Sequence, residues 1–184
     1  MRLFIAINFT PEIKETLSKA MSELKKQAIS ANLTRQENLH MTLAFIGESE
    51  RVDDIAAVID EVFEAPVDMT LALGGVGRFG NLYYANINST DEAEIRNKKE
   101  RSKLALYAEV LADRLRMEGF DIEDREFRPH VTLAREVNSY GAIKFSIPKK
   151  TMAVHRISLM RSDRVSLPGG KSRMKYTEVW GKDI

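Results

Sequence analysis

The sequence of 184 residues contains no cysteine and no long hydrophobic run, and its positive and negative charges nearly cancel. Without cysteine, the chain has no disulfide bonds, thiolate metal ligands or cysteine nucleophiles. Because it lacks a run of about 20 apolar residues, no transmembrane helix is expected, and the apolar stretch at residues 3–7 is too short for a signal peptide. We therefore expect a cytoplasmic protein that has no membrane partner.

A formal net charge of +1 argues against indiscriminate binding to long nucleic acids, since such binding usually requires a large excess of basic residues. It is compatible with a small basic pocket that holds a single phosphate. The hydrophobic content of 43% and the charged content of 30% are ordinary for a globular protein and suffice for a core. A chain of this length fits one domain or two small lobes that share an interface.

Hydrophobic periodicity predicts a chain in which strands and helices are interspersed. The first helix has a favourable start, because Thr10 can cap it and Pro11 suits its first position. The residues between the first helix and the next strand are expected to form a polar link. Strands are expected at residues 1–9, 38–46, 67–76, 82–87, from 130 onward, around 143–147, at 151–160 and at 174–180, and helices at residues 11–26, 52–63 and 92–118.

Two of the three histidines open closely similar segments that lie ninety positions apart. Residues 40–44 read His-Met-Thr-Leu-Ala and residues 130–134 read His-Val-Thr-Leu-Ala. Because side chains alternate along a strand, each histidine shares a face with the threonine two positions later. By the same alternation, Leu39, Met41, Leu43 and Phe45 are expected on the core face of the first strand. The third histidine, His155, lacks such a threonine and is expected to be an incidental strand residue.

Two matching pairs of histidine and threonine are suited to acid–base chemistry on a phosphate. If the two halves pack about a pseudo-twofold axis, His40, Thr42, His130 and Thr132 converge on one groove. Imidazole has a pKa near 6.5, so one ring can accept a proton while the other donates one, and each such transfer typically contributes about 10²–10⁴ in rate. The threonine hydroxyls can donate hydrogen bonds to an anion held between the rings. This pattern favours phosphodiester cleavage, and an anion-binding site without turnover stays open as an alternative.

Other motifs in the sequence fail their structural requirements. The glycines of residues 75–80 match a dinucleotide-binding pattern, but a strand-like segment follows where a helix is needed, so we expect a turn or bulge. The Gly-Lys-Ser of residues 170–172 lacks the first glycine of a phosphate-binding loop and is expected to form a hairpin turn. No metal-binding spacing and no serine-hydrolase motif accompanies either histidine. The charged run at residues 98–103 is expected to be a solvated helix face or a helix break.

The paired motifs resemble those of the 2H phosphoesterase superfamily. The opening residues 1–7, the approach at residues 37–40 and the segment 127–135 narrow the resemblance to bacterial and archaeal RNA 2′,3′-cyclic phosphodiesterases, a branch also called 2′-5′ RNA ligase. Residues 161–162, residues 168–170 and Tyr176 also match that branch. The resemblance runs from residue 1 into the C-terminal strand. It implies a single bilobal α+β domain over residues 1–184, with antiparallel sheets lining a central cleft and helices outside.

The resemblance also implies an activity, the opening of 2′,3′-cyclic phosphate ends of RNA or nucleotides to 2′-phosphomonoesters without a metal or other cofactor. Family precedent makes His40 the proton donor to the leaving 3′ oxygen and His130 the proton acceptor from water, although the sequence alone leaves this order open. Thr42 and Thr132 are expected to hold phosphate oxygens. The resemblance leaves open a ligase activity, the physiological RNA, and two rival functions: a non-catalytic nucleotide- or RNA-binding module and a phosphodiesterase for 2′-5′ linked oligonucleotides.

Two arginines are candidates for further substrate contacts. Strand alternation places Arg128 on the histidine face, whereas Arg135 fits the family pattern but is expected to face the other way. One residue departs from the family, since many relatives carry lysine where this chain has Ala44. If that lysine contacts RNA in relatives, substrate length or affinity differs here. The protein is expected to act as a monomer.

Overall fold

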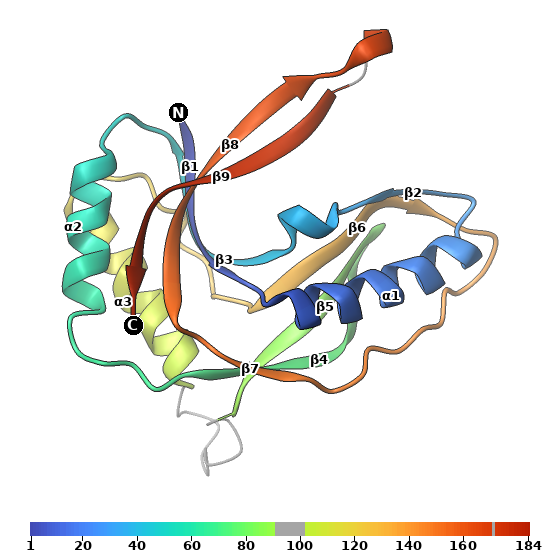
Figure 1. Ribbon diagram of the computed structural model, residues 1–184, viewed down its shortest axis with the longest axis horizontal. Helices are drawn as coiled ribbons and strands as arrows, with labels where there is room; N and C mark the ends of the chain where they lie inside the picture. Colours follow the sequence, from blue (N-terminus) through green and yellow to red (C-terminus); the bar gives the residue numbers. More distant parts are fainter. Residues whose placement is uncertain (91–101, 171) are drawn as a thin grey trace.

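The computed structural model describes residues 1–90, 102–170 and 172–184 of the chain. These residues form an α+β fold in which two antiparallel sheets are covered by three helices (Figure 1). The four-stranded sheet has the order β3-β1-β8-β9, and the five-stranded sheet has the order β2-β6-β5-β4-β7. In chain order the elements are β1 (Arg2–Asn8), α1 (Pro11–Gln27), β2 (Ser30–Leu33), the 3₁₀ turn η1 (Gln36–Asn38), β3 (His40–Glu48), α2 (Val52–Val62), β4 (Thr70–Phe79), β5 (Leu82–Ser89), α3 (Lys103–Met117), β6 (His130–Asn138), β7 (Thr151–Ala153), β8 (Arg156–Ser166), the 3₁₀ turn η3 (Pro168–Gly170) and β9 (Ser172–Asp183).

The helices are exchanged between the two sheets. Helix α1 leaves β1 of the four-stranded sheet but packs on the five-stranded one, where its Leu24 is buried with Tyr83 and Ala134. Helix α3 follows β5 of the five-stranded sheet, yet it packs beside α2 next to the four-stranded sheet (Figure 1). Thr10 caps α1 as expected, its hydroxyl accepting a hydrogen bond from the N–H of Ile13 at 3.4 Å. None of the helices in the described ranges is long and apolar enough to span a bilayer.

Each of the two histidine strands carries a β-bulge at the same place in its motif. In β3, Thr42 pairs with Ala6 and Ala44 pairs with Ile5, so Leu43 is an extra residue. A bulge places two successive residues opposite one and thereby resets the alternation of side chains. Phe45 is consequently 54% exposed on the histidine side, and Ile46 is buried in its place. The expectation that Phe45 belongs to the core face was therefore wrong.

The second strand repeats this geometry. In β6, Thr132 pairs with Tyr84 and Ala134 pairs with Tyr83, so Leu133 is the extra residue. Residues before the extra leucine keep the alternation that the sequence predicts, whereas residues after it change face. The expectation that Arg135 faces away from the histidine was therefore wrong, because Arg135 lies beyond the bulge on the face of Thr132.

The expected strand at residues 151–160 is two strands in different sheets. β7 pairs with β4 in the five-stranded sheet, and β8 pairs with β1 and β9 in the four-stranded sheet. The chain crosses between the sheets at residues 154–155, so the exposed His155 lies in the crossing and not in a strand. Periodicity cannot detect such a change of sheet, because both pieces have the hydrophobicity of a strand.

Two further predictions about secondary structure were wrong. The polar link after the first helix contains β2, which pairs with β6. Residues 143–147 do not form a strand. Instead the side-chain amide of Gln27 bonds both the N–H and the C=O of Lys144, at 2.9 and 2.8 Å, and so satisfies backbone groups that a neighbouring strand would otherwise bond. Residues 92–101 of the helix expected at 92–118, with most of the charged run at 98–103, fall outside the described residues.

The two glycine motifs lie in hairpins, as the sequence predicted. Residues 75–80 end β4 and lead into β5, with a register irregularity between Leu73 and Val76 that accommodates the glycines. The second motif lies where β8 connects to β9. Of this connection, the structure describes the 3₁₀ turn η3 up to Gly170 and the start of β9 at Ser172. Neither motif precedes a helix that could bind a phosphate at its N-terminus.

Candidate active site

The two sheets bring the motif strands β3 and β6 into contact, with β3 at the edge of its sheet. His40 pairs with Asn8 of the neighbouring strand β1, and His130 pairs with Asn86 of the neighbouring strand β5. The two imidazoles lie close enough for the charge of His130 to lower the pKa of His40. The fold therefore brings the two motif strands together, while the convergence of His40, Thr42, His130 and Thr132 on one groove stays a prediction.

Both histidines are oriented by the same backbone contact. Nδ1 of His40 lies 2.7 Å from the carbonyl oxygen of Asn38, and Nδ1 of His130 lies 2.7 Å from that of Arg128. A carbonyl oxygen only accepts hydrogen bonds, so Nδ1 carries the proton in each ring. This leaves Nε2 of both rings as the atom that can accept or donate a proton.

His40 is enclosed by aromatic side chains. Its ring centroid lies 4.9 Å from that of Phe4 and 5.2 Å from that of Tyr176, which meets it edge-on. Nε2 of His40 lies 3.0 Å from the hydroxyl oxygen of Thr42. Burial is the largest cause of a lowered pKa at His40, and the positive charges of Lys14, His130 and Arg135 lower it further, while the Asn38 carbonyl opposes the shift.

His130 has more open surroundings. Its ring meets Tyr84 at a centroid distance of 5.3 Å, and Tyr84 stacks on the exposed ring of Phe79 at 4.5 Å. A Cβ atom at Gly77 would overlap the Tyr84 ring, so glycine allows that ring to lie against β4. A pocket beside His130 is lined by these aromatics, Asn86 and the segment that precedes β6.

The two candidate arginines occupy different positions. Arg128 precedes β6, is exposed, and donates to Oε2 of Glu126 at 3.4 Å from both Nε and Nη2. Its backbone carbonyl holds His130, and its side chain belongs to the lining of the adjacent pocket. Arg135 lies on the histidine face beyond the bulge, and its charge acts on His40. By contrast, the Ala44 side chain is 6% exposed and packs in the core, so the departure from the family pattern does not lie on the histidine face.

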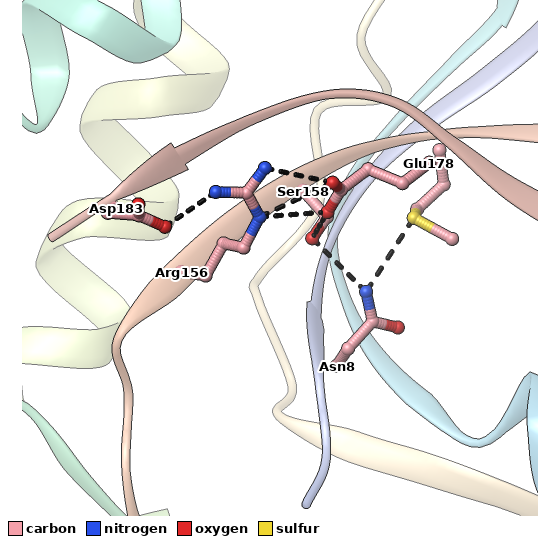
Figure 2. A network of polar contacts seen from close by, with 6 residues as sticks. Asn8, Arg156, Ser158, Glu178 and Asp183 are labelled. Carbon is pink, nitrogen blue, oxygen red and sulfur yellow. Dashed lines mark hydrogen bonds and ion pairs between the residues drawn. The ribbon is translucent and has the colours of Figure 1, made fainter.

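A polar network that sequence reasoning missed supports the strand beside His40 (Figure 2). Asn8 donates to the hydroxyl of Ser158 at 3.1 Å, Ser158 donates to Glu178 at 2.5 Å, and Arg156 donates to Glu178 at 2.9 Å. The network joins β1, β8 and β9. A Cβ atom at Gly181 would press against the Arg156 guanidinium, so glycine provides its space. In the sequence, the one local indication of this network is Asn8, a polar residue at the end of an apolar strand.

Comparisons with known proteins show the family and the fold. The family model described as the 2′-5′ RNA ligase superfamily matches residues 13–166. An RNA 2′,3′-cyclic phosphodiesterase of Thermotoga maritima is 28% identical over 142 residues, which cover 73% of this chain and 70% of the relative. One from Methanocaldococcus jannaschii is 29% identical over 154 residues, covering 83% and 77%. The crystal structure of E. coli LigT complexed with 3′-AMP matches with a TM-score of 0.75 at 22% identity, covering 100% of this chain and 97% of that one. The structural match to LigT shows that the two proteins share a fold.

Proposed function

The chain belongs to the 2′-5′ RNA ligase superfamily, and we propose that it hydrolyses the 2′,3′-cyclic phosphate ends of RNA to 2′-phosphomonoesters. The observation that carries this proposal is the pair of imidazoles with matching geometry. Each ring has Nδ1 bound to a backbone carbonyl, which leaves Nε2 as the nitrogen that can exchange a proton, and a threonine on the same strand face. At His40 the threonine hydroxyl lies 3.0 Å from Nε2. The curated relatives named above carry the same activity in their names.

The reaction requires one proton transfer at each side of the phosphorus atom. Nε2 of His130 takes a proton from water as the water oxygen forms a bond to phosphorus. The bond between phosphorus and the 3′ oxygen breaks, and Nε2 of His40 gives its proton to that oxygen. The products are a 2′-phosphomonoester and a 3′ hydroxyl, and the two histidines end with their protonation states exchanged. Thr42 and Thr132 donate hydrogen bonds to the non-bridging oxygens, where negative charge gathers.

The proposed role of His40 as proton donor depends on the bound phosphate. In the structure, burial and nearby positive charges lower the pKa of His40 and favour its neutral form. A phosphodiester anion between the rings adds negative charge beside His40, which favours the imidazolium form and raises this pKa. Substrate binding would therefore favour protonation of His40, which the proposed role as proton donor requires. The cations Lys14 and Arg135, which disfavour that proton, would at the same time attract the phosphate.

The decisive experiment compares three histidine substitutions. His40→Ala and His130→Ala are each expected to lower kcat for a nucleoside 2′,3′-cyclic phosphate by at least about 10²–10⁴-fold, because each removes one proton transfer. His155→Ala is the matched control, since His155 is exposed in the crossing between the sheets. Circular dichroism should show all three variants folded, and EDTA should leave the wild-type rate unchanged. Full activity of either groove variant would exclude the mechanism.

Mapping the product separates the rival functions. A binding module would retain cyclic nucleotide without forming a monoester, and a phosphodiesterase for 2′-5′ linkages would cleave 2′-5′ linked oligonucleotides faster than cyclic ends. Phosphorus NMR of the reaction distinguishes a 2′-monoester from a 3′-monoester. Incubating 2′,3′-cyclic phosphate ends with 5′-hydroxyl ends at high concentration tests ligation, in which a 5′ hydroxyl replaces water as the nucleophile, the bond to the 3′ oxygen again breaks, and the same two proton transfers apply.

A further inference from the structure

The outer part of the β8–β9 hairpin projects beyond the four-stranded sheet (Figure 1). β1 pairs with β8 only from Ser158 to Arg161, and beyond that point β8 pairs with β9 alone among the described strands. We call residues 162–166 and 172–176 the outer ribbon. A two-stranded ribbon without a covering layer contributes little burial. Its length is therefore not explained by the hydrophobic core.

The outer ribbon begins beside His40. The Tyr176 ring meets the His40 ring, and the side-chain amide of Asn38 donates to the backbone carbonyl of Met174 at 2.9 Å. The carbonyl of the same Asn38 accepts the hydrogen bond from Nδ1 of His40. One residue thus connects the orientation of the catalytic ring to the position of the ribbon.

Positive charge is concentrated on this hairpin. Residues 161–176 include five basic residues and one acidic residue, in a chain whose formal net charge is +1. The acidic residue, Asp163, is paired with Arg161 at 2.8 Å. Arg164, Arg173 and Lys175 are exposed, and no ion pair joins any of these three to another side chain in the described ranges. The balanced composition of the whole chain conceals this basic segment.

The register of the hairpin divides these charges between its two faces. Ser162 pairs with Tyr176 and Arg164 pairs with Met174, so Arg164 shares the face that Tyr176 presents to His40. It lies one pair further out, about 7 Å along the strand at 3.3 Å per residue. Arg173 and Lys175 alternate with these positions and lie on the opposite face.

We propose that the histidine face of the outer ribbon binds the RNA strand that leads out of the groove, with Arg164 contacting a backbone phosphate near the cyclic end. The inference rests on the proposed function and adds to it that an RNA strand, and not a lone cyclic mononucleotide, is the preferred substrate. A guanidinium is suited to a phosphate because it offers several donors in a plane. Exposed charges can also prevent strands from pairing with other molecules. In that role, charges on either face of the ribbon would serve equally well.

The test uses two substrates and two arginine variants with the same change of charge. The substrates are a nucleoside 2′,3′-cyclic phosphate and a single-stranded RNA dodecamer that ends in a 2′,3′-cyclic phosphate. Arg164→Gln is expected to lower kcat/KM for the dodecamer about five-fold at 0.1 M salt, the loss of one phosphate contact at a salt slope of about 0.7 per contact. The dodecamer's slope of log kcat/KM against log salt should weaken by the same 0.7. The mononucleotide should be hydrolysed at the wild-type rate. Arg173→Gln, on the opposite face, is the matched control and should change the dodecamer rate by less than two-fold.

The outcomes are distinguishable from failure of the proposed function. Equal losses in Arg164→Gln and Arg173→Gln, no loss in either, or equal losses on both substrates would each overturn the inference. If the wild-type protein hydrolyses neither substrate, the proposed function fails. The ribbon is then tested by fluorescence anisotropy with a 5′-labelled dodecamer, where weaker binding in Arg164→Gln alone supports the inference and equal binding rejects it.

Discussion

The two histidine sites share their backbone and differ in their surroundings. Each ring is held by the carbonyl two residues earlier, and each strand carries an extra leucine three residues after its histidine. The side chains around these matching backbone segments differ. His40 is enclosed by Phe4 and Tyr176, whereas His130 lies beside a pocket lined by the stacked rings of Phe79 and Tyr84.

This difference separates two properties of an acid–base pair. The repeated backbone contact leaves the same nitrogen, Nε2, available for proton exchange in both halves. The neighbours decide how readily that nitrogen carries a proton, because burial and nearby cations disfavour the charged ring. At His40 these neighbours lower the pKa. The proposed donor role of His40 therefore needs an anion beside the ring, which favours the imidazolium form.

After the loss of either histidine, the largest expected effect comes from removing the hydroxyls that accompany the rings. Thr42→Val and Thr132→Val should each lower kcat by about 10²–10³-fold, the usual loss for one donor to a developing oxyanion. Thr42→Val should be the more damaging, because its hydroxyl also lies 3.0 Å from Nε2 of His40. Steady-state kinetics with a cyclic mononucleotide measures both losses. The threonine-to-serine variants keep the hydroxyl and are the controls, and a Thr42→Val enzyme within ten-fold of wild type would contradict the proposed contact.

An intermediate effect is expected on the protonation of His40. An NMR titration of the imidazole nitrogens should place the pKa of His40 below the ordinary histidine value near 6.5. Tyr176→Ser admits water to the ring and should raise that pKa, whereas Tyr84→Ser, the corresponding change beside His130, should leave the His40 signal unchanged. Inorganic phosphate should raise the pKa of His40 in the wild-type protein. If phosphate binds and the pKa of His40 stays low, the proposal that substrate binding protonates His40 is wrong.

Alternation correctly placed each histidine on one face with its threonine, because those residues come before the bulges. His40, Thr42, His130 and Thr132 obey simple alternation. Phe45 and Arg135 lie beyond the extra leucines, where alternation is reset, so prediction from parity failed at both. A bulge has no signature in a Thr-Leu-Ala segment, and the family pattern for Arg135 was the better guide.

The surroundings of the rings could not be predicted because they come from distant parts of the chain. Phe4 reaches His40 from β1, which pairs with β3, and Tyr176 reaches it from β9 at the other edge of the same sheet. The change of sheet at residues 154–155 was hidden for the same reason, since hydrophobicity reports burial and not the partner strand. The charge of the outer ribbon was visible in the sequence, but a total for the whole chain averages it away.

The smallest expected effect concerns the network that supports β1 beside His40. Glu178 accepts hydrogen bonds from Arg156 and Ser158, and its side chain is about one third exposed. Glu178→Gln should therefore reduce the free energy of unfolding by only about 1 kcal/mol at pH 7, the value for hydrogen bonds to a charged group after screening by solvent. Urea denaturation measures the difference, and Asp183→Asn is the control because Asp183 bonds the same Arg156 guanidinium from a more exposed position.

The pH dependence of this difference tests its electrostatic origin. Arg156 holds the pKa of the Glu178 carboxyl below its ordinary value. Its contribution to stability is then present above the unfolded pKa, near 4.3 for glutamate, and is lost as the pH falls through the lower pKa of the folded state. The wild-type protein and Glu178→Gln should converge in stability as urea titrations are taken from pH 7 toward pH 3. A difference that persists unchanged at pH 3 would mean that Glu178 supports the His40 side through packing and not through its charge.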